Sequence, residues 1–310
     1  MNINEKDKIL KEAIVETIAF FDMFNFPLTE TEILKYIKIK SDYLEVRKEL
    51  MNLIRDKVVC SSEGLYFLVG ADLNIEARKE NYNHSDRKFK LALKVSKYFL
   101  IIPWIKLICV ANNIGTDNLK NSGDIDLFIV SKPKKIWLTR LFVVLIAKIM
   151  NVRPQKNNKT DKICLSFFIS EDSLDLSELR QGGEADKYFE YWLLGLNPIY
   201  SKDNTFEMLF KANRKIIDNF PNYYEQKISS KRKMNKQISG FYELNWELFF
   251  GKLESLVKNI QIKIMPAELK SIASQGVGVI LGDNVIKLHL NDKREEFRKK
   301  YNEKISKIKN

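Results

Sequence analysis

Four apolar runs between residues 105 and 169 constrain the fold of this chain most. Ile105 to Ala111 and Ile163 to Ile169 have the length and the partly β-branched character of buried strands. Between them lie a strand that ends in Leu127 to Val130 and a nearly continuous apolar run of helix length, Leu138 to Met150. This order of strand, polar turn, strand, helix and strand predicts an α/β protein with a sheet at its core.

Two aspartates, Asp124 and Asp126, lie where a polar turn meets the second of these strands. Side chains at i and i+2 of a strand point to the same face, so both carboxylates should emerge together while Ile125 goes to the other side. Two adjacent carboxylates repel each other unless a cation or a proton lies between them. Mg²⁺ suits this arrangement, because it prefers oxygen ligands and commonly brings phosphates with it. Aspartates that only cap the backbone of a turn are the structural alternative.

The order of these elements resembles the nucleotidyltransferase fold of the DNA polymerase β superfamily. The signature of that family is a strand ending in Gly-Ser or Gly-Gly, a spacer of roughly ten residues, and Asp-x-Asp or Asp-x-Glu between apolar residues. In this chain Asn112-Asn113 takes the Gly-Ser position, residues 114 to 123 form the spacer, and Asp124-Ile125-Asp126-Leu127 matches the carboxylate motif. The resemblance covers about residues 100 to 200, the length of a small domain.

The resemblance implies transfer of a nucleoside monophosphate from an NTP, with ATP expected first, to an acceptor while pyrophosphate leaves. Asp124 and Asp126 would hold Mg²⁺, which neutralises charge and aligns the attack. Asn112 and Asn113 would contact the triphosphate. The acceptor stays open between RNA, a protein hydroxyl and a small molecule, and the oligomeric state stays open as well.

Two departures from the family pattern support an alternative function. Asn112 and Asn113 replace the Gly-Ser pair, although asparagine offers amide donors and tolerates the left-handed backbone. Many members also carry a third carboxylate on the later strand, where it acts as general base or metal ligand. The nearest position here is the uncharged Ser166, and Asp161 precedes the strand. The alternative is therefore a catalytically inactive protein of the same fold that binds nucleic acid or protein.

The charge of the chain bears on its partners. The sequence has 310 residues, with 52 Lys and Arg against 40 Asp and Glu, a formal net charge of +12. Such an excess favours contact with the phosphates of RNA, DNA or a nucleotide, whereas solvated faces of a Lys-rich chain are the neutral alternative. The excess is clustered in four runs: Lys132 to Lys135, Arg153 to Lys162, Lys227 to Lys236, and Lys293 to Lys300.

Cysteine and histidine usage argues against a zinc site and for a cytoplasmic location. Cys60, Cys109 and Cys164 are far apart, so we expect reduced thiols in a cytoplasmic protein. His84 and His289 are isolated, and His289 is expected at the surface. The longest apolar run is too short to span a bilayer, so no membrane partner is expected.

Residues 1–70 form a predicted winged-helix-like module. Apolar residues at helical spacing predict a first helix over residues 8 to 24. Thr29 and Glu32 form a capping-box pattern for a second helix through Ile37, and Tyr43 to Lys57 fits a third. Two short apolar segments then predict a hairpin, which completes the order of a winged helix. Basic and acidic residues balance in the third helix, so protein contact is favoured over DNA binding. A winged-helix transcription factor with an appended ligand domain is a further reading.

The rest of the chain divides into a helical linker at residues 71–100, a nucleotidyltransferase-like mixed-sheet core at 101–200, and a helical C-terminal region with a hairpin at 201–310. The aromatic residues of a predicted helix at 184–194 are assigned to core packing, and Asn197-Pro198 is expected to end that segment. Helices are predicted at 205–219, 242–264 and 292–308, with a hairpin at 276–290 around a Gly-Asp-Asn turn.

Overall fold

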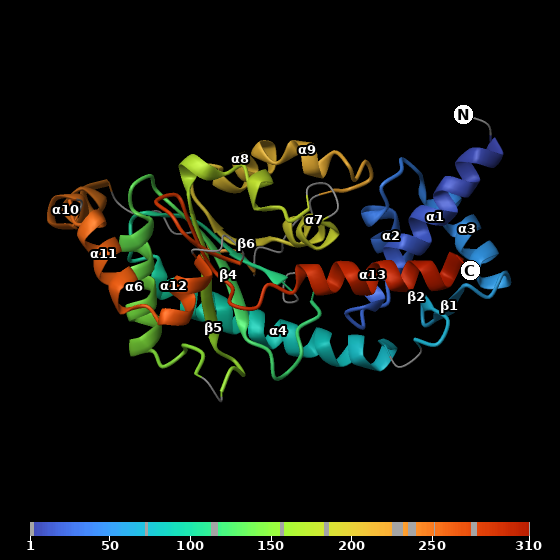
Figure 1. The fold of residues 1–310 in the computed structure, drawn as a ribbon, viewed down its shortest axis with the longest axis horizontal. Coiled ribbons are helices and arrows are strands. Elements are labelled where there is room, and N and C mark those ends of the chain that lie inside the picture. The colour runs from blue at the N-terminus through green and yellow to red at the C-terminus, as the bar shows by residue number, and fades with distance from the viewer. Residues whose placement is uncertain are drawn as a thin grey trace.

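The computed structural model describes residues 3–71, 74–112, 117–155, 158–182, 186–224, 232–234, 240–250, 252–273 and 278–309. A mixed sheet with helices around it occupies one end of the long axis, and the N-terminal helices and both chain ends lie at the other (Figure 1). The predicted α/β class with a mixed sheet is therefore confirmed. Within the part of the chain that the structure describes, no helix combines the length and the apolar character needed to cross a membrane.

The N-terminal region has the predicted order of three helices followed by a hairpin. Its elements are α1 (Ile3–Asp22), α2 (Glu30–Tyr36), α3 (Tyr43–Arg55), β1 (Val59–Ser62) and β2 (Leu65–Leu68). The capping box at the start of α2 is present: Thr29 accepts from the backbone of Glu32, and the Glu32 carboxylate accepts from the backbone of Thr29. The elements pack around one apolar cluster that includes Ile18, Leu50 and Phe21. Its identity as a winged helix stays a prediction.

Among the residues that the structure describes, six strands form the central sheet in the order β6-β3-β4-β5-β8-β7. Of the pairings between them, β4 with β5 is parallel and the others are antiparallel. The three strands predicted around the two aspartates are confirmed as β3, β4 and β5. The strands are β3 (Ile105–Val110), β4 (Ile125–Ser131), β5 (Ile163–Ser170), β6 (Asn197–Ser201), β7 (Val279–Leu281) and β8 (Val285–Leu288).

Two of these strands correct the sequence-based expectations. Asn197 and Pro198 do not end a segment but begin β6, which lies at the edge of the sheet and pairs with β3. Proline is tolerated there because an edge strand leaves one side of its backbone unpaired. The predicted C-terminal hairpin is confirmed as β7 and β8, but it joins the central sheet, since β8 pairs with β5.

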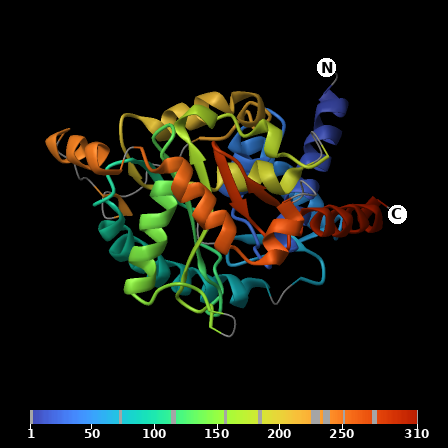
Figure 2. The same cartoon turned by 60° about the vertical axis from the view of Figure 1, so that its left-hand side comes forward.

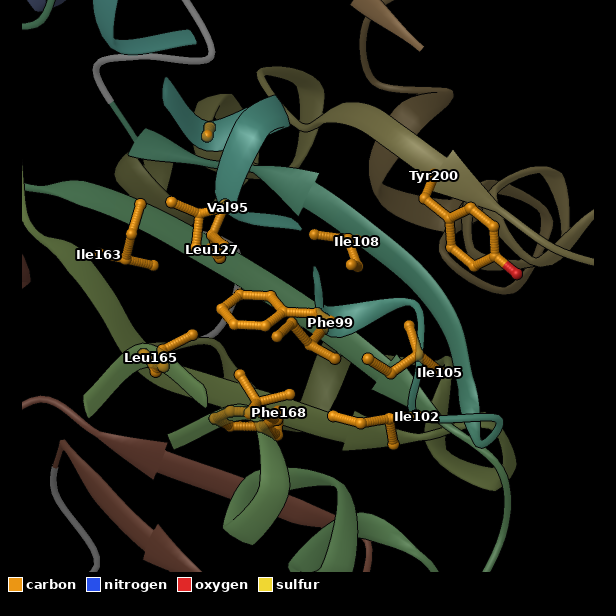
Figure 3. Packing of buried hydrophobic residues seen from close by; sticks show 14 of the residues in the cluster. Val95, Phe99, Ile102, Ile105, Ile108, Leu127, Ile163, Leu165, Phe168 and Tyr200 are labelled. Carbon is orange, nitrogen blue, oxygen red and sulfur yellow. The ribbon is translucent and has the colours of Figure 1, made fainter. Parts of the chain in front are cut away.

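One face of the sheet is covered by two of the predicted helices, α4 (Asn74–Phe99) and α6 (Ile136–Ile149). Figure 3 shows the apolar layer between these helices and the sheet, in which Val95 and Phe99 of α4 lie over Leu127 of β4 and Phe168 of β5. α11 (Glu254–Ile264) packs beside α6, as Figure 2 also shows. The carboxylate of Glu254 accepts the backbone N–H groups of Trp137 and Leu138 at 2.7 and 2.9 Å, so it caps the start of α6.

The opposite face is covered by α7 (Lys187–Leu194), α8 (Thr205–Ala212) and α9 (Arg214–Ile217). The helix predicted over 205–219 is thus two short helices, and the one predicted over 242–264 is divided into α10 (Gly240–Phe250) and α11. The described residues also form α12 (Ala267–Ala273), α13 (Arg294–Lys309) and two short 3₁₀ helices, η1 (Glu171–Ser173) and η2 (Ser177–Leu179). Figure 1 shows α13 running from the sheet back to the N-terminal helices, where Tyr301 joins their apolar cluster.

Candidate functional site

The predicted site lies where four central strands of the sheet begin or end, and the pairing of the strands explains why. β4 and β5 are parallel, so both begin at this site, whereas the antiparallel β3 and β8 end there. Asn112 follows β3, Asp126 lies near the start of β4, Cys164 lies near the start of β5, and His289 follows β8. Residues from four segments that are distant in the sequence therefore meet at one place.

The structure brings the two predicted aspartates together with a third residue. One ligand atom each of Asp124, Asp126 and Cys164 lie within 4.8 Å of one another. Burial, and after it the charge of Asp124, raise the pKa of Asp126 to about 6, while a hydrogen bond with the side chain of Asn112 lowers it. Asn112 has a left-handed backbone with φ of 55°. Asn113 lies outside the described residues, so its contact with the triphosphate stays a prediction.

A polar stripe on α4 holds the loop that carries the aspartates. Asn81 donates to the Asn118 side chain at 2.8 Å, and the Ser85 hydroxyl accepts the backbone N–H of Leu119 at 2.7 Å. One turn further on, the fully buried Lys88 donates to the carbonyl of Gly123, directly before Asp124. These contacts give the helix predicted as a linker a definite role, since they fix the backbone from which both carboxylates project.

Asp161, the other acid considered for the site, is engaged elsewhere. Its carboxylate lies 3.1 Å from Nζ of Lys88 and also binds Arg87. These cations hold the pKa of Asp161 below its ordinary value, with the hydrogen bond from Arg87 as the largest cause. Asp161 therefore supports the loop and does not belong to the group of ligand atoms around Asp126.

The third position of the site is filled by Cys164, where Ser166 was expected. In the parallel ladder Asp126 pairs with Cys164, and the register shifts between Asp126 and Phe128. Ser166 is half-buried and contacts Cys164 with 3.3 Å between Oγ and Sγ. Leu165 lies in the apolar layer under α4 and α6, and side chains alternate along a strand, so Ser166 points to the opposite face, which carries the carboxylates, as predicted. It lies two residues after Cys164, the residue that pairs with Asp126.

His289 continues this line of side chains and is half-buried, so the expectation of a surface position is met only in part. Its Nε2 lies 3.3 Å from the Ser166 hydroxyl, and its Nδ1 is buried without a hydrogen-bond partner among the described residues. Burial, and after it the charge of Lys287, lower the pKa of His289 to about 4. Together with the hydrogen bond between Cys164 and Asp126, these contacts form a continuous chain from Asp126 through Cys164 and Ser166 to His289.

A pocket of about 230 Å³ adjoins this chain. Two stacked aromatic pairs line it: Phe167 with Trp192, whose ring centroids are 5.3 Å apart, and Tyr188 with Phe297, at 5.2 Å. Tyr188 and Trp192 lie four residues apart on α7, so they project from the same face of that helix. Their assignment to core packing is thus incomplete, because both also line the pocket. Its polar lining consists of Asn112, Lys287, His289, Asn291, Asp292, Lys293 and Arg294.

The charges at the pocket are largely compensated within the protein. Asp292 binds Lys287 at 2.9 Å and Arg294 at 2.7 Å, and Arg294 also binds Asp186 at 2.7 Å. Burial alone would raise the pKa of Asp292, but hydrogen bonds from Arg294 and Lys287 outweigh it and hold that pKa well below its ordinary value. The pocket is therefore lined by aromatic side chains, and the positive charges of Lys287 and Arg294 are balanced by Asp292 and Asp186.

The donor atoms of the site fit a hard cation in part. Mg²⁺ is commonly held by one or two carboxylates, with waters and substrate phosphates as its other ligands, and Asp124 and Asp126 supply that number. The thiol of Cys164 is a soft donor that Mg²⁺ does not favour, and burial raises its pKa well above the ordinary value. The residues thus fit Mg²⁺ through two oxygens, with Cys164 as a neutral neighbour.

Comparison of this chain with protein-family models, with curated proteins and with solved structures found no match. Sequence reasoning missed the parts that Cys164, His289 and the α7 aromatic residues play in this arrangement. The spacing of the cysteines and histidines gave no signal for it. The alternation of β5 did carry one, since Cys164 and Ser166 interrupt the apolar strand on one face.

Proposed function

We propose that the chain is a Mg²⁺-dependent nucleotidyltransferase, which moves a nucleoside monophosphate from an NTP to an acceptor. The observation that carries the proposal is the meeting of Asp124 and Asp126 at a sheet edge beside an aromatic pocket. Bound Mg²⁺ would neutralise charge on the triphosphate and orient it. ATP is the first NTP to test.

The protein side chains divide the work. Asp124 and Asp126 present the oxygens that hold the metal, and the loop bonded to α4 keeps them in place. Asn112 hydrogen-bonds Asp126 and also lines the pocket, so it connects a proposed metal ligand with the space open to a substrate. These groups bind and orient the reacting molecules, and such positioning supplies much of the rate enhancement in phosphoryl chemistry.

Calorimetry of Asp126→Asn tests the proposal. The full chain is titrated with each of the four NTPs, with and without Mg²⁺, and the wild type should bind at least one NTP only when Mg²⁺ is present. Asp126→Asn should weaken that binding at least about tenfold, because one of two metal-binding carboxylates is lost. Asp172→Asn is the matched control, since Asp172 is an exposed acid that lies shortly after the end of β5. Equal Mg²⁺-dependent affinity in the wild type and Asp126→Asn would remove the proposed site.

A second candidate function is favoured by Cys164. A neutral thiol beside Asp126 cannot replace a third carboxylate as a base, so the chain would then be an inactive member of this fold that binds nucleic acid or protein through its basic surface. Release of pyrophosphate from a bound NTP separates the two candidates. NTP binding without any release over hours, together with RNA binding that weakens steeply with salt, would favour the binder.

A further inference from the structure

We propose that the pocket beside α7 binds the acceptor of the transfer reaction, a planar aromatic molecule that carries a hydroxyl group, and that His289 receives the hydroxyl proton. This inference rests on the proposed function, because it names the acceptor class for the same site. Three observations support it: aromatic side chains line the pocket, the buried cations at the pocket are paired with acids, and His289 has a buried nitrogen without a partner among the described residues.

The walls of the pocket suit a flat ring. Phe167 stacks on Trp192, Tyr188 stacks on Phe297, and all four rings line the pocket of about 230 Å³. Aromatic side chains favour offset-stacked or edge-to-face contacts with another ring, and they bury a large apolar area in doing so. A flat aromatic guest can make such contacts with these rings, whereas a polar chain would leave them without matching contacts.

The buried ionic groups favour a neutral guest. Lys287 and Arg294 are compensated by Asp292 and Asp186, so they do not offer uncompensated positive charge to a phosphate. Lys293 is exposed and lies at the pocket lining. Burying a charged guest without a partner would be costly, so the ring inside the pocket should be uncharged.

His289 provides the polar contact that a hydroxyl needs. Its Nδ1 is buried without a partner among the described residues, and buried polar atoms of this kind are rare unless a ligand or water meets them. Lys287, Asp292 and Arg294 are the charged groups around the ring, and burial beside them keeps the imidazole neutral, with one nitrogen able to accept. The hydroxyl of an acceptor can donate to such a nitrogen.

The reaction balances with groups already named. The acceptor oxygen forms a bond to the α-phosphorus of the NTP, the bond from that phosphorus to the bridging oxygen breaks, and pyrophosphate leaves. The hydroxyl proton passes to Nδ1 of His289, whose Nε2 faces Ser166 at 3.3 Å. From there the contacts of Ser166 with Cys164 and of Cys164 with Asp126 connect His289 to one of the proposed metal ligands.

A pair of probes that differ only in the hydroxyl tests the inference on the full wild-type chain. p-Cresol and toluene are titrated while the indole N–H signal of Trp192 is followed by NMR, and a Trp192→Phe variant identifies that signal. p-Cresol should bind roughly three- to tenfold more tightly than toluene, the effect of about one neutral hydrogen bond. In His289→Phe, which keeps a ring but has no nitrogen, the two probes should bind equally. Calorimetry with ATP and Mg²⁺ is run on the same samples.

Each outcome decides between the two proposals. ATP binding that requires Mg²⁺, together with a p-cresol preference that His289→Phe abolishes, supports both. ATP binding without any preference for p-cresol overturns the acceptor pocket and leaves the proposed function standing. A p-cresol preference without ATP binding overturns the acceptor role, because the reaction partner is then missing. If His289→Phe does not fold, the comparison of the two probes on the wild type still decides.

Discussion

Two carboxylates, one in the N-terminal region and one in the central sheet, have the same raised pKa and different surroundings. Asp22 ends α1 in the N-terminal region, and Asp126 lies near the start of β4. Burial is the largest cause in both, and it brings the pKa of each to about 6. Asp22 accepts the backbone N–H of Leu68 at 2.9 Å and lies 3.7 Å from Nζ of Lys304, whereas Asp126 faces Asp124 and Cys164.

The difference between the two lies in what each carboxylate faces. Asp22 joins three segments of the fold, because its partners come from β2 and α13. Asp126 faces a like charge and a neutral thiol beside a pocket, which no structural requirement explains. A raised pKa alone therefore does not mark a functional residue, and the neighbouring groups must be considered with it.

The largest expected effect is a pH dependence of stability that Asp22 creates and Asp22→Asn removes. The folded pKa of Asp22 is about 6, above its ordinary value of 3.8, so its stabilising contribution is complete below about pH 3.8 and is lost as pH rises through about 6. Between pH 4 and pH 7 the wild type should lose roughly 2.4 kcal/mol of unfolding free energy relative to Asp22→Asn, since each pKa unit is worth about 1.4 kcal/mol and part of the effect is already lost at pH 4. Urea unfolding of both proteins across this range measures the difference.

The comparison of the two proteins controls for other groups that titrate in this range. His289 has the opposite sign, because its folded pKa is lowered to about 4, and its contribution is lost as pH falls from about 6.5. Asp126 and His289 are present in both proteins, so they cancel in the difference. Parallel curves for wild type and Asp22→Asn would show that Asp22 is not buried as a carboxylate in the folded state.

The core could be predicted from the sequence because its signals are local. Strand length, the i, i+2 spacing of the aspartates and the apolar run before residue 150 each depend on a few adjacent residues. The capping box at Thr29 and Glu32 is local in the same way and was found as expected. These patterns fixed which face of β4 carries Asp126, and hence where one part of the site lies.

The rest of the site depends on pairings between distant segments. Cys164 stands beside Asp126 because β5 runs parallel to β4 in one particular register, and the sequence of β5 alone does not specify that register. His289 reaches Ser166 because β8 pairs with β5, although the hairpin that contains it was assigned to another region. Long-range pairing of this kind has no signal in a single sequence. The third position of the site was therefore assigned to Ser166, although the residue that pairs with Asp126 is Cys164.

A smaller effect is expected when a third carboxylate is added beside Asp126. Cys164→Asp places three carboxylates in contact, and without Mg²⁺ their repulsion should lower the free energy of unfolding by roughly 2 kcal/mol. Added Mg²⁺ should restore that stability, because a third oxygen ligand strengthens the metal site. Urea unfolding with and without Mg²⁺ measures both changes. This variant would sharpen the contrast with Asp22, whose surroundings offer the cation of Lys304.

Ser166→Asp is the matched control for this change. Ser166 lies on the same strand and faces the same side, but Cys164 is the residue that belongs to the group of ligand atoms within 4.8 Å. The stabilisation by Mg²⁺ should therefore be larger in Cys164→Asp than in Ser166→Asp. A larger Mg²⁺ effect in Ser166→Asp would return the third ligand position to the residue expected from the sequence.

The smallest effect concerns the cation that faces Asp22. Lys304→Met removes the charge 3.7 Å from the Asp22 carboxylate and keeps most of the apolar side-chain volume. Because Lys304 is about a third exposed, with 31% of its side chain accessible, solvent screens the pair, and the loss at pH 7 should be only about 0.5–1 kcal/mol. At pH 4 Asp22 is mostly protonated, so the same substitution should have almost no effect there. A double-mutant cycle with Asp22→Asn tests the assignment, since Lys304→Met should cost nothing in that background. An equal loss at both pH values, or in both backgrounds, would mean that Lys304 stabilises α13 through its stem and not through Asp22.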